Sequence, residues 1–356
     1  MRHLSIFATP RALCAAAAIA FLAGCSGSGP STIAPKPLLP QNGVLLPADS
    51  VPSAVNPRDL FGRNRSTGHR HFVTFDACPK TGPIVYASDG TNSVINIYKG
   101  RFASQAPCGQ IIYAGLNTPY GLYVKLGTHD LYVANAFSVL VFHRGATAPY
   151  NTYIDPTNQV PNDVTVANDG TIIASNLGQY NGPEKGSIST WIAGPNGGTF
   201  VGNFPMTNDI QGGFITVQKN GTVYYDDQDA TTSHGAVWSL SCPAGVCGAQ
   251  TQVAGVSLGY PGGLASDASD DLLVTDSQPG KAETFELPNP NPQSFPMAGI
   301  VFGMAINQHD YHWFVADALN NDAAEYSYPS GTLIGTVPGN PGGNLDGIAI
   351  DPGHAP

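Results

Sequence analysis

One sequence pattern recurs along residues 71–356, and this repetition constrains the fold more than any other feature of the chain. Its clearest copy is PYGLYVKLGTHDLYVANAFSVLVFHRG, from Pro119 to Gly145. There, a turn rich in Pro and Gly precedes three short segments that read as strands, at 122–125, 131–135 and 139–142. Corresponding positions in successive copies lie 42, 50, 50, 40 and 44 residues apart: Gly121, Asp163, Gly213, Gly263, Gly303 and Gly347. Copies of one small β unit at this spacing indicate repeated sheets rather than helical domains.

The second strand of the pattern occurs six times: Ile84 to Ser88, Leu131 to Asn135, Thr171 to Ser175, Thr222 to Asp226, Leu272 to Thr275 and His312 to Ala316. Three or four short strands in each such unit are typical of β-propellers. The segment from Leu345 to Gly353 reads as a first strand with no second strand after it, whereas the first copy begins at its second strand. We therefore predict an all-β, six-bladed propeller of four-stranded blades over residues 71–356, whose last strand completes the first blade and removes open sheet edges.

The composition agrees with this fold and excludes other classes. Charged residues make up only 11% of the chain, which also holds 42 Gly and 30 Pro, so a coiled coil or helical bundle is excluded. The hydrophobic content of 42% is too high for a disordered chain. The net charge is −10 and the 15 Lys and Arg residues are scattered, which excludes nucleic acid as a partner because phosphate binding needs concentrated basic side chains.

Residues 1–24 read as a signal peptide. Arg2 and Arg11 give a positive start, and the apolar stretch from 13 to 22 is too short to span a membrane. The LAGC motif at 22–25 resembles the bacterial lipoprotein processing box. This resemblance implies that Cys25 carries a lipid, that the membrane is a partner through it, and that the protein is anchored in the bacterial cell envelope, at the outer membrane or cell surface. The alternative is an ordinary secretory signal that is cut nearby.

Residues 25–70 read as an extended tether. Proline recurs throughout this stretch, with Ser and Gly between, and no apolar period is sustained. Such a segment would hold the folded domain away from a lipid surface.

The repeats resemble NHL-type propeller repeats, whose strands read like GLAVD and LYVAD. The closest matches are LYVAN at 131–135, IVYASDGTNSVINIY at 84–98 and LDGIAID at 345–351. The chain is more loosely similar to gluconolactonase-like propellers. Patterns this short specify a fold better than a function.

Chain direction places the Pro- and Gly-marked turns and the ends of all second strands on one face of the propeller, here called the leading face. Carboxylate and amide side chains end the second strands there, and such oxygens bind cations or sugar hydroxyls. The candidate binding residues are these side chains and two tyrosines that flank the turns: Asp89, Asn135, Asn176, Asp226, Asp227, Asp276, Asp317, Tyr120 and Tyr260. The alternative is that each Asp or Asn only hydrogen-bonds its own turn and that the tyrosines pack there.

A metal site is implied only by the gluconolactonase-like resemblance. In those propellers, acidic and amide side chains of several leading turns hold a divalent ion such as calcium. Asn162 and Asp346 match that pattern, with Asn208 or Asp209 as a weaker third ligand, but Tyr120, Gly262 and Phe302 stand at the other turns. Because a hard cation takes about six or more oxygens, no cofactor is the main expectation.

Motifs for hydrolytic chemistry are missing. The sequence contains no G-x-S-x-G and no H-E-x-x-H, and no histidine falls at a leading turn. His129, His309 and His312 fall in turns on the opposite face and read as scattered, solvated side chains.

Four cysteines remain in the predicted domain. Cys242 and Cys247 bracket one hairpin, and Cys78 and Cys108 fall on the same face of the first blade. We predict two disulfides, Cys78 with Cys108 and Cys242 with Cys247, subject to the usual Cα separation. The spacing does not favour zinc.

The sequence as a whole favours a surface-tethered binding module for an unidentified protein, peptide or carbohydrate, and no catalytic residues are assigned. One alternative is a metal-dependent lactonase or sugar-acid hydrolase that uses Asn162 and Asp346. Another is a purely structural envelope protein.

Overall fold

A computed structural model describes residues 75–102, 106–179, 185–207, 209–229, 234–277, 281–285, 293–297, 301–307, 309, 311–318 and 320–353. The expected signal peptide (1–24), the lipidation site Cys25 and the tether (25–70) lie outside these residues. No helix in the described part is long and apolar enough to cross a membrane.

The described strands form six four-stranded antiparallel sheets. The first sheet has the order β24 (Leu345–Asp351), β1 (Ile84–Asp89), β2 (Val94–Lys99) and β3 (Gly109–Ile111). The next two sheets follow the sequence, with β4 (Leu122–Lys125), β5 (Asp130–Asn135), β6 (Ser138–Phe142) and β7 (Asn151–Ile154), then β8 (Gln159–Val166), β9 (Thr171–Gln179), β10 (Ser187–Ile192) and β11 (Thr199–Pro205).

The last three sheets also follow the sequence. They consist of β12 (Asp209–Val217), β13 (Thr222–Asp229), β14 (Gly235–Ser241) and β15 (Thr251–Gln252); β16 (Pro261–Ser266), β17 (Leu272–Asp276), β18 (Lys281–Phe285) and β19 (Gln293–Pro296); and β20 (Val301–Ile306), β21 (His312–Asp317), β22 (Asp322–Ser327) and β23 (Leu333–Pro338). The described residues also include three short 3-10 helices, which lie between strands or before them: η2 (Phe75–Ala77), η3 (Pro195–Gly197) and η4 (Pro243–Gly245).

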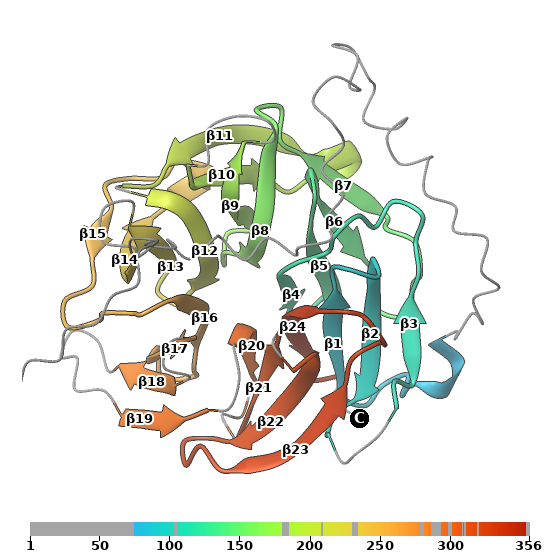
Figure 1. Cartoon of the computed structure of the whole chain (residues 1–356). Coiled ribbons are helices and arrows are strands. Elements are labelled where there is room, and N and C mark those ends of the chain that lie inside the picture. The colour runs from blue at the N-terminus through green and yellow to red at the C-terminus, as the bar shows by residue number, and fades with distance from the viewer. Residues whose placement is uncertain are drawn as a thin grey trace, which may run out of the picture. The chain divides into compact units, whose positions relative to one another are not determined.

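The sheets are arranged as the blades of a propeller. Figure 1 shows them around a common centre, with β4, β8, β12, β16, β20 and β24 innermost, and each of these strands contacts the inner strand of the next sheet. The predicted second strands all lie in β1, β5, β9, β13, β17 and β21. The prediction of an all-β propeller with four-stranded blades is therefore confirmed.

The C-terminal strand completes the first blade, as predicted. β24 pairs with β1 in antiparallel register, with Ile84 opposite Asp351 and Tyr86 opposite Ala349. Residues more than 250 positions apart in the sequence thus share one sheet.

The hydrophobic core lies between neighbouring blades. Ile95 and Ile97 of β2 pack with Leu131 and Val133 of β5, and all four side chains are buried. Burial of one such aliphatic side chain stabilises a fold by about 1.5–3 kcal/mol. Because both sides of each sheet are covered, the strands are apolar on both faces, and Trp191 and Trp313 are buried in this packing.

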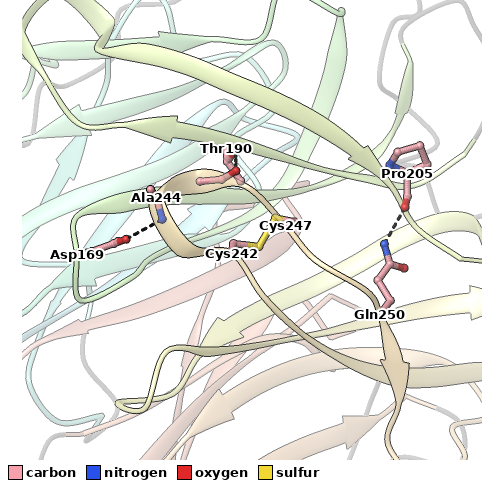
Figure 2. Close-up of a disulfide and its surroundings, with 8 residues drawn as sticks. Asp169, Thr190, Pro205, Cys242, Ala244, Cys247 and Gln250 are labelled. Carbon is pink, nitrogen blue, oxygen red and sulfur yellow. Dashed lines mark hydrogen bonds between the residues drawn. A yellow bond between two sulfur atoms is a disulfide. The ribbon is translucent and has the colours of Figure 1, made fainter.

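Both predicted disulfides are present. Cys78 bonds to Cys108, with Cα atoms 5.0 Å apart, and Cys242 bonds to Cys247. Figure 2 shows the loop closed by the second disulfide lying against the preceding blade, where the Ala244 amide donates to Asp169. The hydroxyl of Thr190 donates to the Gly245 carbonyl at 2.6 Å. The loop therefore links two blades.

Candidate functional site

The inner strands come closest together at their leading ends, which are here called the throat: Gly121, Asp163, Gly213, Gly263, Gly303 and Gly347. A Cβ atom on Gly303 would lie 3.0 Å from the Gly347 Cα, and one on Gly347 would lie 2.9 Å from the Gly121 Cα. Real Cβ atoms do not come that close to backbone. Contact between blades therefore requires glycine at Gly121, Gly263, Gly303 and Gly347, because a side chain there would push the strands apart. A Cβ atom on Gly213 would instead meet Asp226 of the same blade.

Hydrogen bonds join the strands of the throat directly. The Gly121 amide donates to the Asn162 carbonyl at 2.8 Å, and the Ile215 amide donates to the Asp163 carboxylate at 3.0 Å. The Ser175 hydroxyl donates to the Gly213 carbonyl at 2.6 Å. These contacts hold β4, β8 and β12 at a fixed separation.

Two aromatic rings occupy the centre at the leading end. Phe214 and Phe302 stack with ring centroids 6.1 Å apart, and Tyr260 lies 6.2 Å from Phe302. Phe214 belongs to β12 and Phe302 to β20, two strands that are separated by β16. Rings from non-adjacent blades can meet only inside the channel, so this contact obstructs the leading end.

Three buried carboxyl groups lie at or beside the throat. Burial raises the pKa of Asp163 to about 7 and the pKa of Asp346 to about 8. Burial also raises the pKa of Asp226 well above its ordinary value, and the neighbouring Asp227 and Asp163 raise it further. Desolvation thus favours the neutral, protonated carboxyl in this part of the molecule.

The channel widens toward the opposite face into a cavity of about 460 Å³, here called the funnel. All six inner strands contribute to its wall, which consists of residues 121–126, 163–168, 215–219, 264–268, 270, 303–307, 348–350 and 352. Of the residues of the leading turns, Gly121, Asp163 and Gly303 reach its wall. Small-molecule sites have volumes of about 300–1,000 Å³, so the funnel is large enough for a ligand.

The wall of the funnel mixes apolar and polar groups. Ile306 and Ile348 supply apolar surface, while Gln218 and Asn307 supply amide groups. The inner edge of an innermost strand has no further strand beside it, so backbone N–H and C=O groups also face the centre.

The leading-face residues that the sequence pointed to are buried rather than arranged around an open mouth. The exposed fractions are 0% for Asp89, Asn135 and Asn176, 4% for Asp276 and 3% for Asp317. Asp89 and Asp317 hydrogen-bond their own turns, whereas Asn135 and Asp276 accept from the turn that precedes the first strand of the same blade. Asp89 accepts from the Asn92 amide, Asn135 from the Asn117 amide, Asp276 from the Gly259 and Tyr260 amides, and Asp317 from the Asn320 amide, whereas Asn176 donates to Ser187 and Ser189. Asp226 and Asp227 are likewise buried.

The two tyrosines are not free surface residues either. Tyr120 is partly buried against the core between the second and third blades, and burial raises its pKa. Tyr260 is partly buried and lies beside Phe302.

Asn162 and Asp346 do not fit a divalent cation site as they are arranged. The Asn162 amide donates to the Gly213 carbonyl at 2.8 Å. The Asp346 carboxyl accepts from the Gly90 amide at 3.2 Å and from the Asn344 amide at 2.7 Å, and its raised pKa favours the neutral form. Among the described residues, no three His, Cys, Asp or Glu side chains gather as metal ligands would. Asn208 and the side chain of Asp209 lie outside the described part.

The expectation that the histidines are scattered, solvated side chains is wrong for two of them. His129 is buried, with its Nδ1 2.8 Å from Asp351, and Arg144 pairs with the other Asp351 oxygen. His312 lies 3.1 Å from Glu325. Asp351 lies 222 residues from His129 in the sequence, so no local pattern indicates that pair, whereas Glu325 lies on β22, the strand that follows the strand of His312. None of the described histidines lines the funnel.

Comparisons with known proteins identify the fold alone. No family model matches the chain, and no curated protein is similar to it in sequence. A chain of the nidogen/laminin complex has 15% identity and a TM-score of 0.62, with 77% of this chain and 100% of that chain covered. A Bacteroides caccae protein of unknown function has 11% identity and a TM-score of 0.54, covering 76% and 99%. A functionally unknown Desulfotomaculum acetoxidans protein has 13% identity and a TM-score of 0.53, covering 78% and 100%.

Proposed function

We propose that this chain is a bacterial cell-envelope lipoprotein that presents a six-bladed, NHL-like propeller as a binding module. Cys25 carries the lipid, residues 25–70 form the tether, and the propeller binds a protein, peptide or carbohydrate group at its funnel. The observation that carries the binding role is the funnel itself, a cavity of about 460 Å³ to which every inner strand contributes.

Because the funnel lies toward the opposite face, we propose the binding site there and not on the leading face. At the leading end, glycine contacts and the stacked Phe214 and Phe302 rings leave little room. At the opposite end, the wall is open and mixed in polarity. A ligand group that enters there is enclosed on all sides by strands held in a closed ring.

The lipid anchor can be tested by labelling. Cells that express the full chain are grown with an alkyne-bearing fatty acid, and the label on the protein is read after a click reaction. We expect labelling of the wild type and none of Cys25→Ser. Equal labelling of both proteins would refute the anchor while leaving the binding role intact.

The binding role can be tested by filling the funnel. Thr216 lies in β12 on the funnel wall, whereas Thr251 lies exposed on the outer strand β15, so Thr216→Trp and Thr251→Trp are matched substitutions. Full-length protein in detergent is applied to glycan and peptide arrays. We expect the wild type and Thr251→Trp to give defined array signals. Thr216→Trp should lose these signals, while its melting temperature should not be lower than that of the wild type. Array signals unchanged by Thr216→Trp, or no signal at all, would overturn a funnel-based binding module.

A further inference from the structure

The strand pair that closes the ring is gripped at one end by an arginine of the neighbouring blade. Asp351, the last residue of β24, lies opposite Ile84, the first residue of β1. This end of the pair, with the loop before β1, is here called the closing junction: residues 79–84 and 349–353. Arg144 follows β6 in the second blade, and its guanidinium contacts the chain on both sides of the junction.

On the β1 side, Arg144 binds the backbone that leads into the strand. Its Nε donates to the Lys80 carbonyl at 3.2 Å, and its Nη2 donates to the carbonyls of Pro79, at 3.0 Å, and Gly82. Three carbonyls of one loop therefore share one cation. The planar guanidinium carries five N–H donors in a fixed fork, so it can hold these carbonyls in one arrangement.

On the β24 side, the partner is the carboxylate of Asp351, which is fully buried. Arg144 Nη1 pairs with one of its oxygens, while His129 Nδ1 and the Gly353 amide each lie 2.8 Å from the other. The Arg144 side chain is itself only 9% exposed. This is a buried ion pair, and removing the arginine would leave a buried charge without its main compensation.

The other end of β24 is held by different groups. There, the Gly347 amide donates to the Ser88 hydroxyl at 2.8 Å, and the Gly90 amide donates to the Asp346 carboxyl at 3.2 Å. These bonds lie within the first blade and do not involve Arg144. A change at Arg144 should therefore loosen β24 from its Asp351 end.

We propose that Arg144 is a lock on the closing junction. It holds the C-terminal end of β24 and the loop before β1 against the second blade. Its removal lets β24 fray from Asp351 while the rest of the propeller stays folded. The lock concerns closure of the ring and does not depend on what the funnel binds, so it goes beyond the proposed function.

The first test compares amide hydrogen exchange of the full chain with that of Arg144→Met, which keeps a long side chain but removes the charge. We expect the amides of residues 349–351 to exchange at least about tenfold faster, because one partner of a buried ion pair is lost and local opening becomes easier. Residues 345–347 and the strands of blades three to five should keep the rates of the wild type.

Arg144→Lys separates the two grips of the lock. An ammonium group can pair with Asp351, but as a compact point charge it cannot also hold three carbonyls. Exchange at 349–351 should then stay within about threefold of the wild type. Trypsin cleaves after Lys80, which is exposed and whose carbonyl Arg144 binds. We expect this cleavage to be at least about tenfold faster in Arg144→Lys and in Arg144→Met, since the loop is released. Cleavage after Lys219, exposed in the fourth blade, is the internal reference.

A double variant tests the charge at the junction. Arg144→Met combined with Asp351→Asn leaves no unpaired charge buried, so slow exchange at 349–351 should return. Cleavage after Lys80 should remain fast, because its carbonyl still lacks the guanidinium.

Arg101→Met is the matched control. Arg101 is the other arginine among the described residues of the propeller, and its Nη2 lies 2.7 Å from His312 of the sixth blade. This variant should change neither the exchange at 349–351 nor the cleavage after Lys80.

Three outcomes would overturn the lock. The first is wild-type exchange and cleavage in Arg144→Met. The second is equal acceleration of exchange in all six blades, which would show a general loss of stability. The third is slow cleavage after Lys80 in Arg144→Lys, which would mean that the loop is not held by the guanidinium. If Arg144→Met did not fold, Arg144→Lys and the double variant would still decide between these results.

Discussion

Gly347 of β24 lies so close to Gly121 that a methyl group on Gly347 would come within 2.9 Å of the Gly121 Cα. These residues belong to neighbouring blades and to opposite ends of the repeat region. Gly347→Ala must therefore separate the first two blades at the throat. We expect the free energy of unfolding to fall by about 1–3 kcal/mol or more, as for other overpacked sites, measured by urea denaturation. The control is Gly248→Ala, where the nearest atom to an added Cβ is 3.6 Å away, and which should change stability by less than about 0.5 kcal/mol. Similar losses for both variants would contradict a tight throat.

The buried carboxyl of Asp346 should make the protein less stable as pH rises. Its pKa is raised from 3.8 to about 8 in the folded protein, so between these values the unfolded chain has lost a proton that the folded chain retains. The stabilisation is complete below about pH 4 and is lost as pH rises through about 8. Asp163, with a pKa of about 7, acts in the same direction.

We expect Asp346→Asn to be less sensitive to pH than the wild type in urea denaturation at pH 5, 7 and 9. Asp169→Asn is the control. Hydrogen bonds from the backbone and from Thr171 lower the pKa of this mostly exposed carboxyl, so its contribution to stability changes with pH in the opposite direction. Parallel pH profiles for wild type and Asp346→Asn would show that Asp346 is not the source of the dependence.

The two disulfides should differ in their contribution to stability. Cys78 and Cys108 are 30 residues apart, whereas Cys242 and Cys247 are 5 apart. Loop-closure entropy then predicts losses of about 4 and about 2 kcal/mol when each pair is replaced by alanine. Melting temperatures of the two double variants, measured side by side, test this order. A larger loss for Cys242→Ala with Cys247→Ala would mean that contacts of the loop with Thr190 and Asp169 outweigh chain entropy.

The fold was predictable because each blade repeats one strand pattern that is visible in a single copy. The Gly121 turn, the strand at 131–135 and the unpaired segment at 345–353 were enough to predict four-stranded blades and closure of the first one. The disulfides were predictable for a similar reason, because each pair falls within one blade.

The position of the site was less predictable. The sequence showed acids and amides at the ends of second strands, but burial of Asp89 and Asp317 depends on how neighbouring turns fold over them. Closure of the throat depends on contacts between glycines of different blades, such as Gly303 and Gly347.

The pairing of β24 with β1 also determines when folding can finish. Blade one lacks its innermost strand until residues 345–351 have been synthesised. A nascent chain that lacks these residues cannot close the ring, and the edge of β1 stays without its partner. A propeller built in this way stays open until residues 345–351 reach β1.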